Sequence, residues 1–297
     1  MSEVVAGVLG LGIMGSEFAA HIAAAGVRTL GFDVLPERRA ALEARGVEAC
    51  SSAAALAKEA DVILTSLPSV AALDAGLFGE GGVTSSGRKG MLVVELSTFP
   101  LDAKISARAR LAEAGIAMLD APVSGTGAQA ARKDITVLAS GDCADYVRAE
   151  GVLKHFANVV QRVGPFGDGS KMKFVANLLV TIHTLAAAEA VVLAEKAGLD
   201  SKLMVELLAK SGGGSKMMEV RAPSMAASTY QTPQMKVDVF QKDLDIIGSF
   251  AREVGCAVPL FSASVPYFTS ATAQGMGPYD IGAVVAILRE MAGLAKF

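Results

Sequence analysis

A glycine-rich turn near the start of the chain constrains its fold more than any other feature. Glycines with the spacing G-x-G-x-x-G stand within residues 10–15 and follow the apolar run of residues 4–9. Residues 16–25 then have the composition of a helix, and a second apolar run ends at Asp33. A strand, a glycine turn, a helix and a second strand that ends in an acid are together the pattern of a dinucleotide-binding βαβ unit.

The three glycines have separate physical reasons. The first permits the tight turn, the second lets the backbone approach a pyrophosphate, and the third lets the helix pack closely on the strand. The amides that open the helix face the phosphates, and the helix dipole favours their charge. A glycine turn without a ligand is the alternative, and the strand, helix and acid around this turn argue against it. We expect cofactor contacts from the whole turn: Gly10, Leu11, Gly12, Ile13, Met14 and Gly15.

The acid at Asp33 favours NAD over NADP. Its carboxylate can accept hydrogen bonds from the ribose hydroxyls of adenosine, whereas a 2′-phosphate there would meet a like charge. A second interpretation is that Asp33 caps the turn ahead of Pro36, and the two roles are compatible. Arg38 and Arg39 lie close enough in sequence to soften the preference, so NADP stays open as an alternative.

The hydrophobic pattern predicts two domains. Apolar runs alternate with helical stretches at residues 4–9, 29–33, 61–67, 91–96, 116–119, 135–139 and 159–163. This alternation predicts an α/β fold whose first domain, residues 1–164, is a parallel, doubly wound sheet of the Rossmann type. Residues 165–297 carry helical periodicity and hardly a strand, with breaks expected at sites such as Pro223. We therefore expect an all-α second domain, begun by one long inter-domain helix over residues 171–197.

Composition narrows the partners. The net charge of −3 offers no basic surface for nucleic acid. The apolar stretch 175–194 contains Asn177, His183 and Glu189, which a lipid-facing span would have to bury, so we expect a protein-buried helix and no membrane. The excess of apolar helix favours a homodimer or homotetramer. The three cysteines and three histidines are scattered, and no leader pattern opens the chain. We expect no metal site and a cytoplasmic location.

Five blocks of sequence, in order, resemble the β-hydroxyacid dehydrogenases, the family that includes 3-hydroxyisobutyrate dehydrogenase. They are GLGIMGSEFAAHIAAAG (10–26), SLP (66–68), ELST (95–98) with LDAPVSGTGAQAA (119–131), GDGSKMKFVANLL (167–179) with EAVVLAEKAGLD (189–200), and QKDL (241–244). The resemblance spans nearly the whole chain. It implies NAD(P)-dependent oxidation of a small β-hydroxy acid, a small-molecule carboxylate, reversible to reduction of the semialdehyde or keto acid.

The resemblance also assigns roles to residues. In the motif GxGxxxKxxxN, Lys173 matches the catalytic acid–base, whereas Lys171 lies two residues too early. Asn177 matches a residue that helps to hold the substrate. The loop Ser124, Gly125 and Thr126 matches the site of the substrate carboxylate, and the family's further cofactor contacts match Leu67, Pro68, Thr98 and Lys242.

Elementary chemistry supports Lys173 independently. Lys173 and Asn177 are four residues apart on the predicted helix and therefore share one face. An amine in a low-dielectric cleft has its charged form disfavoured, which suits proton transfer near neutral pH. A lysine at a helix start is usually a solvated surface charge, but this one lies beside an asparagine and just beyond a glycine-rich hinge. The chain departs from the family pattern at Thr126, at 132–134 and at 212–216, which leaves the substrate open.

Two other functions remain as alternatives. A non-catalytic dinucleotide-binding scaffold or sensor would be marked by loss of the catalytic lysine, and Lys173 is present. Imine reduction on the same fold is the second alternative, and the altered substrate segments keep it open.

Overall fold

The chain folds into two units that share one long helix. The structure is a computed structural model that describes residues 4–295. Unit 1 ends at Lys173 and unit 2 begins at Phe174, so the first turns of helix α8 (Asp168–Lys196) belong with unit 1. The predicted boundary lay earlier, at residue 164. The physical reason for the difference is Ser170, whose backbone and hydroxyl both bond to Asp120 of unit 1.

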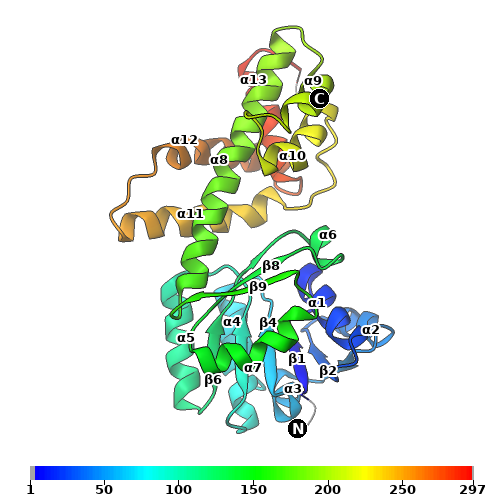
Figure 1. Ribbon diagram of the computed structural model, residues 1–297, viewed down its shortest axis with the longest axis vertical. Coiled ribbons are helices and arrows are strands. Elements are labelled where there is room, and N and C mark those ends of the chain that lie inside the picture. The colour runs from blue at the N-terminus through cyan, green and yellow to red at the C-terminus, as the bar shows by residue number, and fades with distance from the viewer. Residues whose placement is uncertain (1–3, 296–297) are drawn as a thin grey trace. The chain divides into compact units, whose positions relative to one another are not determined.

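A mixed sheet forms the centre of unit 1 (Figure 1). Its parallel part has the order β3-β2-β1-β4-β5-β6. These strands are β1 (Ala6–Leu9), β2 (Thr29–Phe32), β3 (Glu48–Ala49), β4 (Val62–Thr65), β5 (Leu92–Glu95) and β6 (Ala117–Asp120). The register pairs Leu9 with both Phe32 and Thr65, and pairs Glu95 with both Thr65 and Asp120. The carboxyl ends of these strands are therefore level, and the residues that follow them lie along one edge.

The prediction that the sheet is parallel throughout was wrong beyond β6. Strand β8 (Thr136–Ser140) runs antiparallel to β6 and to β7 (Val123–Ser124), while β9 (Val159–Gly164) runs parallel to β8. A parallel connection needs a crossover of about a dozen residues or more, usually with a full helix. Between β7 and β8 the chain forms only the short helix α6 (Gly127–Ala130), so the strand turns back.

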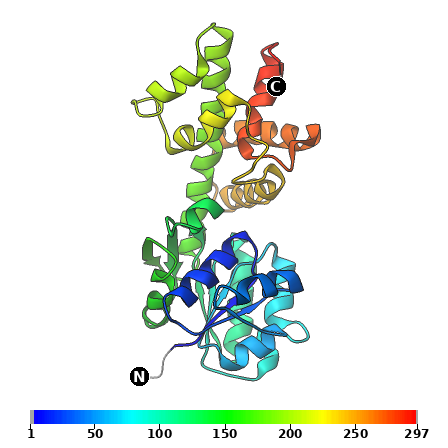
Figure 2. The same cartoon turned by 90° about the vertical axis from the view of Figure 1, so that its right-hand side faces the viewer.

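Helices cover both faces of the sheet, which confirms the doubly wound prediction (Figures 1 and 2). Side chains that alternate along β4 show the arrangement, because Val62 and Leu64 join one core cluster and Ile63 joins the other. The covering helices are α1 (Ile13–Ala24), α2 (Pro36–Glu43), α3 (Ala53–Glu59), α4 (Val70–Phe78), η1 (Val83–Ser86), α5 (Leu101–Glu113) and α7 (Cys143–Lys154).

Unit 2 is helical, as predicted, and has its own core. With the later part of α8 it comprises α9 (Ser201–Leu208), α10 (Lys216–Ala227), α11 (Val237–Glu253), α12 (Pro259–Ala271), η2 (Thr272–Met276), η3 (Ile281–Ala283) and α13 (Val284–Met291). Pro223 lies inside α10 rather than ending a helix, which corrects the predicted break there. Tyr230, Phe240 and Phe268 are fully buried at its centre.

Helix α8 is long and apolar enough to cross a membrane by length and composition alone. Its side chains Ala188 and Val191 are fully buried in the core of unit 2. The helix is therefore a core helix on one side. On other sides it exposes apolar residues, among them Val175 and Leu193.

Candidate active site

The sequence-predicted residues of unit 1 gather along the carboxyl edge of the sheet. The glycine turn follows β1, Asp33 follows β2, Leu67 lies beyond β4, Thr98 beyond β5 and Ser124 beyond β6. Ligands of open α/β sheets bind outside this edge. The geometry thus brings the predicted cofactor and substrate segments of unit 1 to one place.

The glycine turn is tightly packed at Gly10 and Gly15 and open at Gly12. Gly10 has a φ of +94°, and a Cβ added at Gly15 would lie 1.9 Å from the Gly10 carbonyl oxygen. Both glycines are therefore required by the turn itself. A Cβ at Gly12 would meet only the Arg38 guanidinium, at 3.8 Å, so the backbone is open there. The amides at the start of α1 have no side-chain cap, which leaves them to face a phosphate.

Asp33 is buried and holds the glycine turn. Its Oδ2 accepts hydrogen bonds from the Leu11 amide, at 2.8 Å, and from the Arg38 guanidinium, at 3.2 Å. Its Oδ1 accepts from the Leu35 amide at 3.0 Å, so the predicted cap of the turn before Pro36 is present. The carboxylate lies where the second strand ends, as the ribose interpretation requires.

The two segments beyond β4 and β5 are joined by Ser97. The Leu67 amide donates to the Ser97 hydroxyl at 2.9 Å, and the Ser97 amide donates to Glu95 at 2.8 Å. Pro68 is exposed and Thr98 is half-buried. Backbone atoms of the Leu67–Pro68 turn are thereby held at a fixed distance from Thr98.

The predicted substrate loop begins at the half-buried Ser124 and ends at Thr126, which caps the N-terminus of α6. Ser124 and Gly125 are half-buried, and Gly125 has a φ of +147°; a Cβ added there would lie 2.5 Å from the Ile135 side chain. Thr126 forms a capping box with Gln129: its hydroxyl accepts from the Gln129 amide, and its own amide donates to the Gln129 side chain at 3.1 Å. The polar groups of Thr126 are thus occupied by α6, whereas we had expected its amide at a substrate carboxylate.

The two lysines at the start of α8 differ in exposure. Lys171 is exposed and forms an ion pair with Asp168 at 3.0 Å, while Lys173 is half-buried. Asn177 follows one helical turn later and lies in unit 2.

Within unit 2, a carboxylate brings together two residues that the sequence predicted separately. Asn177 is buried and donates from Nδ2 to Asp243 Oδ2 at 2.9 Å. Lys242 Nζ lies 3.2 Å from the other oxygen of Asp243. Since the nitrogen of the Asn177 amide is engaged, its oxygen is the group left to accept a bond from a substrate hydroxyl.

Sequence reasoning missed a buried charged cluster under the same edge. Lys104 is fully buried, and its Nζ lies 2.6 Å from Glu95 Oε2, 2.8 Å from Asp120 Oδ1 and 2.7 Å from the Ser97 carbonyl. Burial raises the pKa of Glu95. Desolvation opposes the charge on Lys104, but the carboxylates of Asp120 and Glu95 outweigh it and raise the pKa of this lysine. The one feature of the sequence that could have indicated this cluster is Glu95, a charged residue within the apolar run 91–96.

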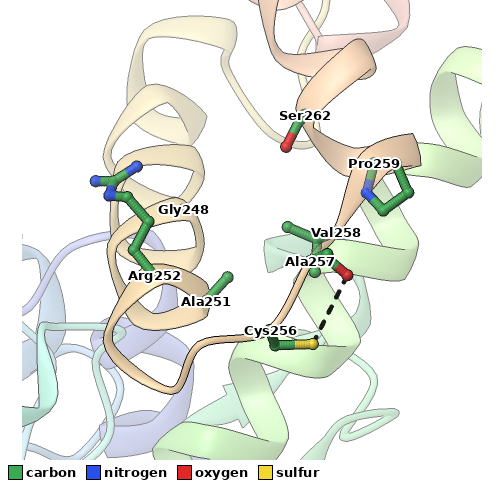
Figure 3. A pocket seen from close by; sticks show the side chains of 8 residues that line it. All are labelled: Gly248, Ala251, Arg252, Cys256, Ala257, Val258, Pro259 and Ser262. Carbon is green, nitrogen blue, oxygen red and sulfur yellow. Dashed lines mark hydrogen bonds between the residues drawn. The ribbon is translucent and has the colours of Figure 1, made fainter.

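A pocket in unit 2 is lined by none of the predicted site residues. It has a volume of about 430 Å³ and lies at the connection of α11 and α12 (Figure 3). Its lining residues are Gly248, Ala251, Arg252, Cys256, Ala257, Val258, Pro259 and Ser262. Within residues 4–295, no three side chains among His, Cys, Asp and Glu come together as a metal site.

The doubly wound sheet, the glycine turn and the acid after β2 define a dinucleotide-binding protein of the Rossmann class. The family profile for the NAD-binding domain of 6-phosphogluconate dehydrogenase matches residues 5–164. The profile described as NAD-binding of NADP-dependent 3-hydroxyisobutyrate dehydrogenase matches residues 167–288.

Individual relatives agree with these profiles. L-threonate dehydrogenase of Cupriavidus necator is 37% identical over 98% of each chain, and 2-(hydroxymethyl)glutarate dehydrogenase of Eubacterium barkeri is 30% identical over 97% of this chain and 96% of that one. A crystal structure of 3-hydroxyisobutyrate dehydrogenase from Salmonella typhimurium is 35% identical, with a TM-score of 0.87 over 96% of this chain and 99% of that one. The chain belongs to the β-hydroxyacid dehydrogenase family and is an NAD(P)-dependent oxidoreductase.

Substitutions in the glycine turn should distinguish an effect on cofactor binding from an effect on folding. Gly12→Ala should fold normally, because the added Cβ meets only the end of the Arg38 side chain at an ordinary contact distance of 3.8 Å, yet should weaken NADH binding about tenfold or more, equivalent to about 1.4 kcal/mol. Gly15→Ala should lose both stability and binding. Gly151→Ala in α7, where nothing lies within 4 Å, is the matched control. NADH fluorescence titration and thermal unfolding measure the two effects. Unchanged NADH affinity in Gly12→Ala would contradict this role of the turn.

Proposed function

We propose that this protein oxidises a hydroxyl group of a small hydroxy acid with NAD, and that L-threonate is the first substrate to test. The observation that carries the proposal is the 37% identity to L-threonate dehydrogenase over 98% of each chain. The retention of Lys173 in the family motif supports it. Threonate has hydroxyl groups on three consecutive carbons, so analysis of the product identifies the carbon that is oxidised.

The substrate carboxylate is assigned to Ser124 and the amide of Gly125. Both are half-buried at the carboxyl edge of the sheet, where a neutral hydroxyl and an amide can donate to an anion. Thr126 contributes by fixing the end of this loop through its capping box. Asn177 presents its side-chain oxygen to a substrate hydroxyl, with Asp243 holding the nitrogen.

Lys173 is assigned as the acid–base. Its Nζ takes the proton of the substrate hydroxyl as the C–H bond breaks, and in the reverse direction it returns that proton to the forming alkoxide. NAD(P), when bound, supplies the hydride acceptor. Residues 10–15, Asp33, Leu67–Pro68, Thr98 and Lys242 are assigned to holding the cofactor. The chain itself thus contributes orientation and one proton transfer.

The two alternatives carry less support. A non-catalytic scaffold has no use for a lysine at the motif position, and Lys173 occupies it. Imine reductases from Streptomyces aurantiacus and Pseudomonas share 20% and 24% identity with TM-scores of 0.64 and 0.60, which establishes a common fold alone.

The acid–base assignment predicts a large difference between two neighbouring lysines. Lys173→Ala should lower kcat about 10²-fold or more, the usual contribution of a general acid–base, and should retain NADH binding. Lys171→Ala is the matched control and should keep wild-type kcat, because Lys171 is exposed and paired with Asp168. Absorbance of the reduced nicotinamide follows both variants on a panel of C3–C5 hydroxy acids that includes L-threonate. Normal turnover by Lys173→Ala would eliminate the assignment.

The NAD preference rests on Asp33. Asp33→Ser removes the charge that opposes a 2′-phosphate and leaves Arg38 nearby, so the NAD/NADP ratio of kcat/KM should fall about tenfold, or about 1.4 kcal/mol. Glu37→Ser, at an exposed position of α2, is the control and should leave the ratio unchanged. A ratio unaltered by Asp33→Ser would show that this carboxylate serves the turn alone.

A homodimer or homotetramer in the cytoplasm completes the proposal. Leu193, Leu203 and Leu207 of unit 2 are 72%, 52% and 63% exposed, and these apolar side chains offer surface that a second copy of the chain could cover. Light scattering should give a mass two or four times that of one chain, and Leu207→Glu should lower it. Val147→Glu, at a 64% exposed position of α7 in unit 1, is the control. A single-chain mass for the wild type would contradict the oligomer, and recovery in a membrane or periplasmic fraction would contradict the location.

A further inference from the structure

Lys104 is a fully buried lysine, and its hydrogen-bond network links residues in or close in sequence to four predicted site segments of unit 1: Leu67–Pro68, Thr98, the Ser124 loop and Lys173. The Lys104 cluster consists of Lys104, Glu95, Ser97, Asp120, Ser140 and Ser170. Lys104 lies on α5. Glu95 is the last residue of β5, Asp120 is the last residue of β6, and Ser170 lies in the first turn of α8. The side chains of Lys104, Glu95 and Asp120 are each 0% exposed.

A continuous path of hydrogen bonds runs through this cluster. The Leu67 amide donates to the Ser97 hydroxyl, and the Ser97 carbonyl accepts from Lys104. Lys104 then donates to Asp120 Oδ1. Asp120 also accepts from the backbone and hydroxyl of Ser170, both at 2.8 Å, and from the hydroxyl of Ser140. The turn beyond β4, the turn beyond β5, the end of β6 and the start of α8 are tied together in this way.

We propose that Lys104 is a positioning residue of the dehydrogenase reaction, which fixes Thr98, Ser124 and Lys173 relative to one another. The inference rests on the proposed function of those three residues. Each lies a short distance along the chain from an anchored group: Thr98 follows Ser97, Lys173 is one helical turn beyond Ser170, and the Ser124 loop leaves β6 at Asp120. Lys104 itself is fully buried beneath these groups.

The composition of the cluster argues against a purely stabilising purpose. Burying charges is costly, and apolar replacements of buried ion pairs are often as stable or more stable. This cluster buries one cation between two carboxylates, which a core chosen for stability alone would avoid. The buried pair Arg221–Asp280 in unit 2 offers a contrast, since Asp280 bonds to the Gln234, Met235 and Gly282 amides, and none of these is a predicted site residue.

Positioning matters here because hydride transfer is sensitive to distance. A displacement of about 1 Å at the reacting groups can cost about 10²-fold in rate. The cluster connects the segment assigned to the nicotinamide with the segment assigned to the substrate carboxylate. Loosening it should therefore slow hydride transfer itself, while the glycine turn that binds the rest of the cofactor stays intact.

The test uses the double variant Glu95→Gln with Lys104→Met. The glutamine oxygen keeps the bond from the Ser97 amide, and Asp120 keeps its donors Ser170 and Ser140, so no carboxylate is left without a partner. Lys154→Met is the matched control, because it removes a lysine from an exposed ion pair with Glu150 on α7. Circular dichroism and NADH titration should show both proteins folded, with NADH affinity within about threefold of wild type.

Two measurements then decide the inference. The first is hydrogen exchange of the NADH complex, in which residues 96–99 and 168–173 should exchange faster together in the double variant while residues 10–15 match wild type. The second uses the hydroxy acid that the wild type turns over fastest, deuterated at its carbinol carbons. The kcat should fall about 10- to 100-fold, and the deuterium isotope effect on kcat should rise as hydride transfer becomes limiting. Lys154→Met should match wild type in both.

The outcomes separate the inference from the proposed function. Unchanged exchange at residues 96–99 and 168–173 would overturn the positioning role, and so would a fall in kcat with the isotope effect and KM unaltered, which is the signature of a smaller folded fraction. A wild-type enzyme that oxidises no hydroxy acid of the panel would defeat the proposed function. Hydrogen exchange would in that case still decide whether Lys104 holds the two segments together.

Discussion

The close approach of helix α1 to strand β1 sets the geometry on which unit 1 depends. Gly15 lies so near Gly10 that an added Cβ would lie 1.9 Å from the Gly10 carbonyl oxygen, so a residue without a Cβ is needed for this approach of the helix to the strand. Asp33 then fixes the turn by accepting a bond from the Leu11 amide. With the turn fixed, the level ends of the parallel strands bring four further segments to the same edge.

Most of the fold could be predicted from the sequence because its signals are local. Apolar runs marked the long strands, and Gly26, Gly46 and Gly115, which have a positive φ, lie just beyond the ends of α1, α2 and α5. The reversal at β8 was missed, because strand direction depends on the length of a connection whose short helix α6 leaves little periodicity. Pro223 predicted a helix break that the structure does not contain, since α10 continues through it.

The sequence predicted some residues of the candidate site and missed others, for a related reason. Residues in motifs were found from their spacing, whereas Lys104 and Asp243 act through contacts with residues far away in the sequence. Lys104 lies in a helix of ordinary composition, and only the buried Glu95 and Asp120 explain it. Thr126 is the opposite case. Its place in a motif predicted a substrate contact, but its amide and hydroxyl are hydrogen-bonded to Gln129.

Asp33 has a practical consequence for anyone who wishes to redesign cofactor use in this chain. One of its oxygens serves both the Leu11 amide and Arg38, and the other serves the Leu35 amide. Replacing this carboxylate therefore removes a structural support of the phosphate-binding turn along with a determinant of preference. The side chain of Arg38 is 46% exposed, whereas that of Asp33 is 5% exposed, so a redesign has more freedom at the arginine than at the acid.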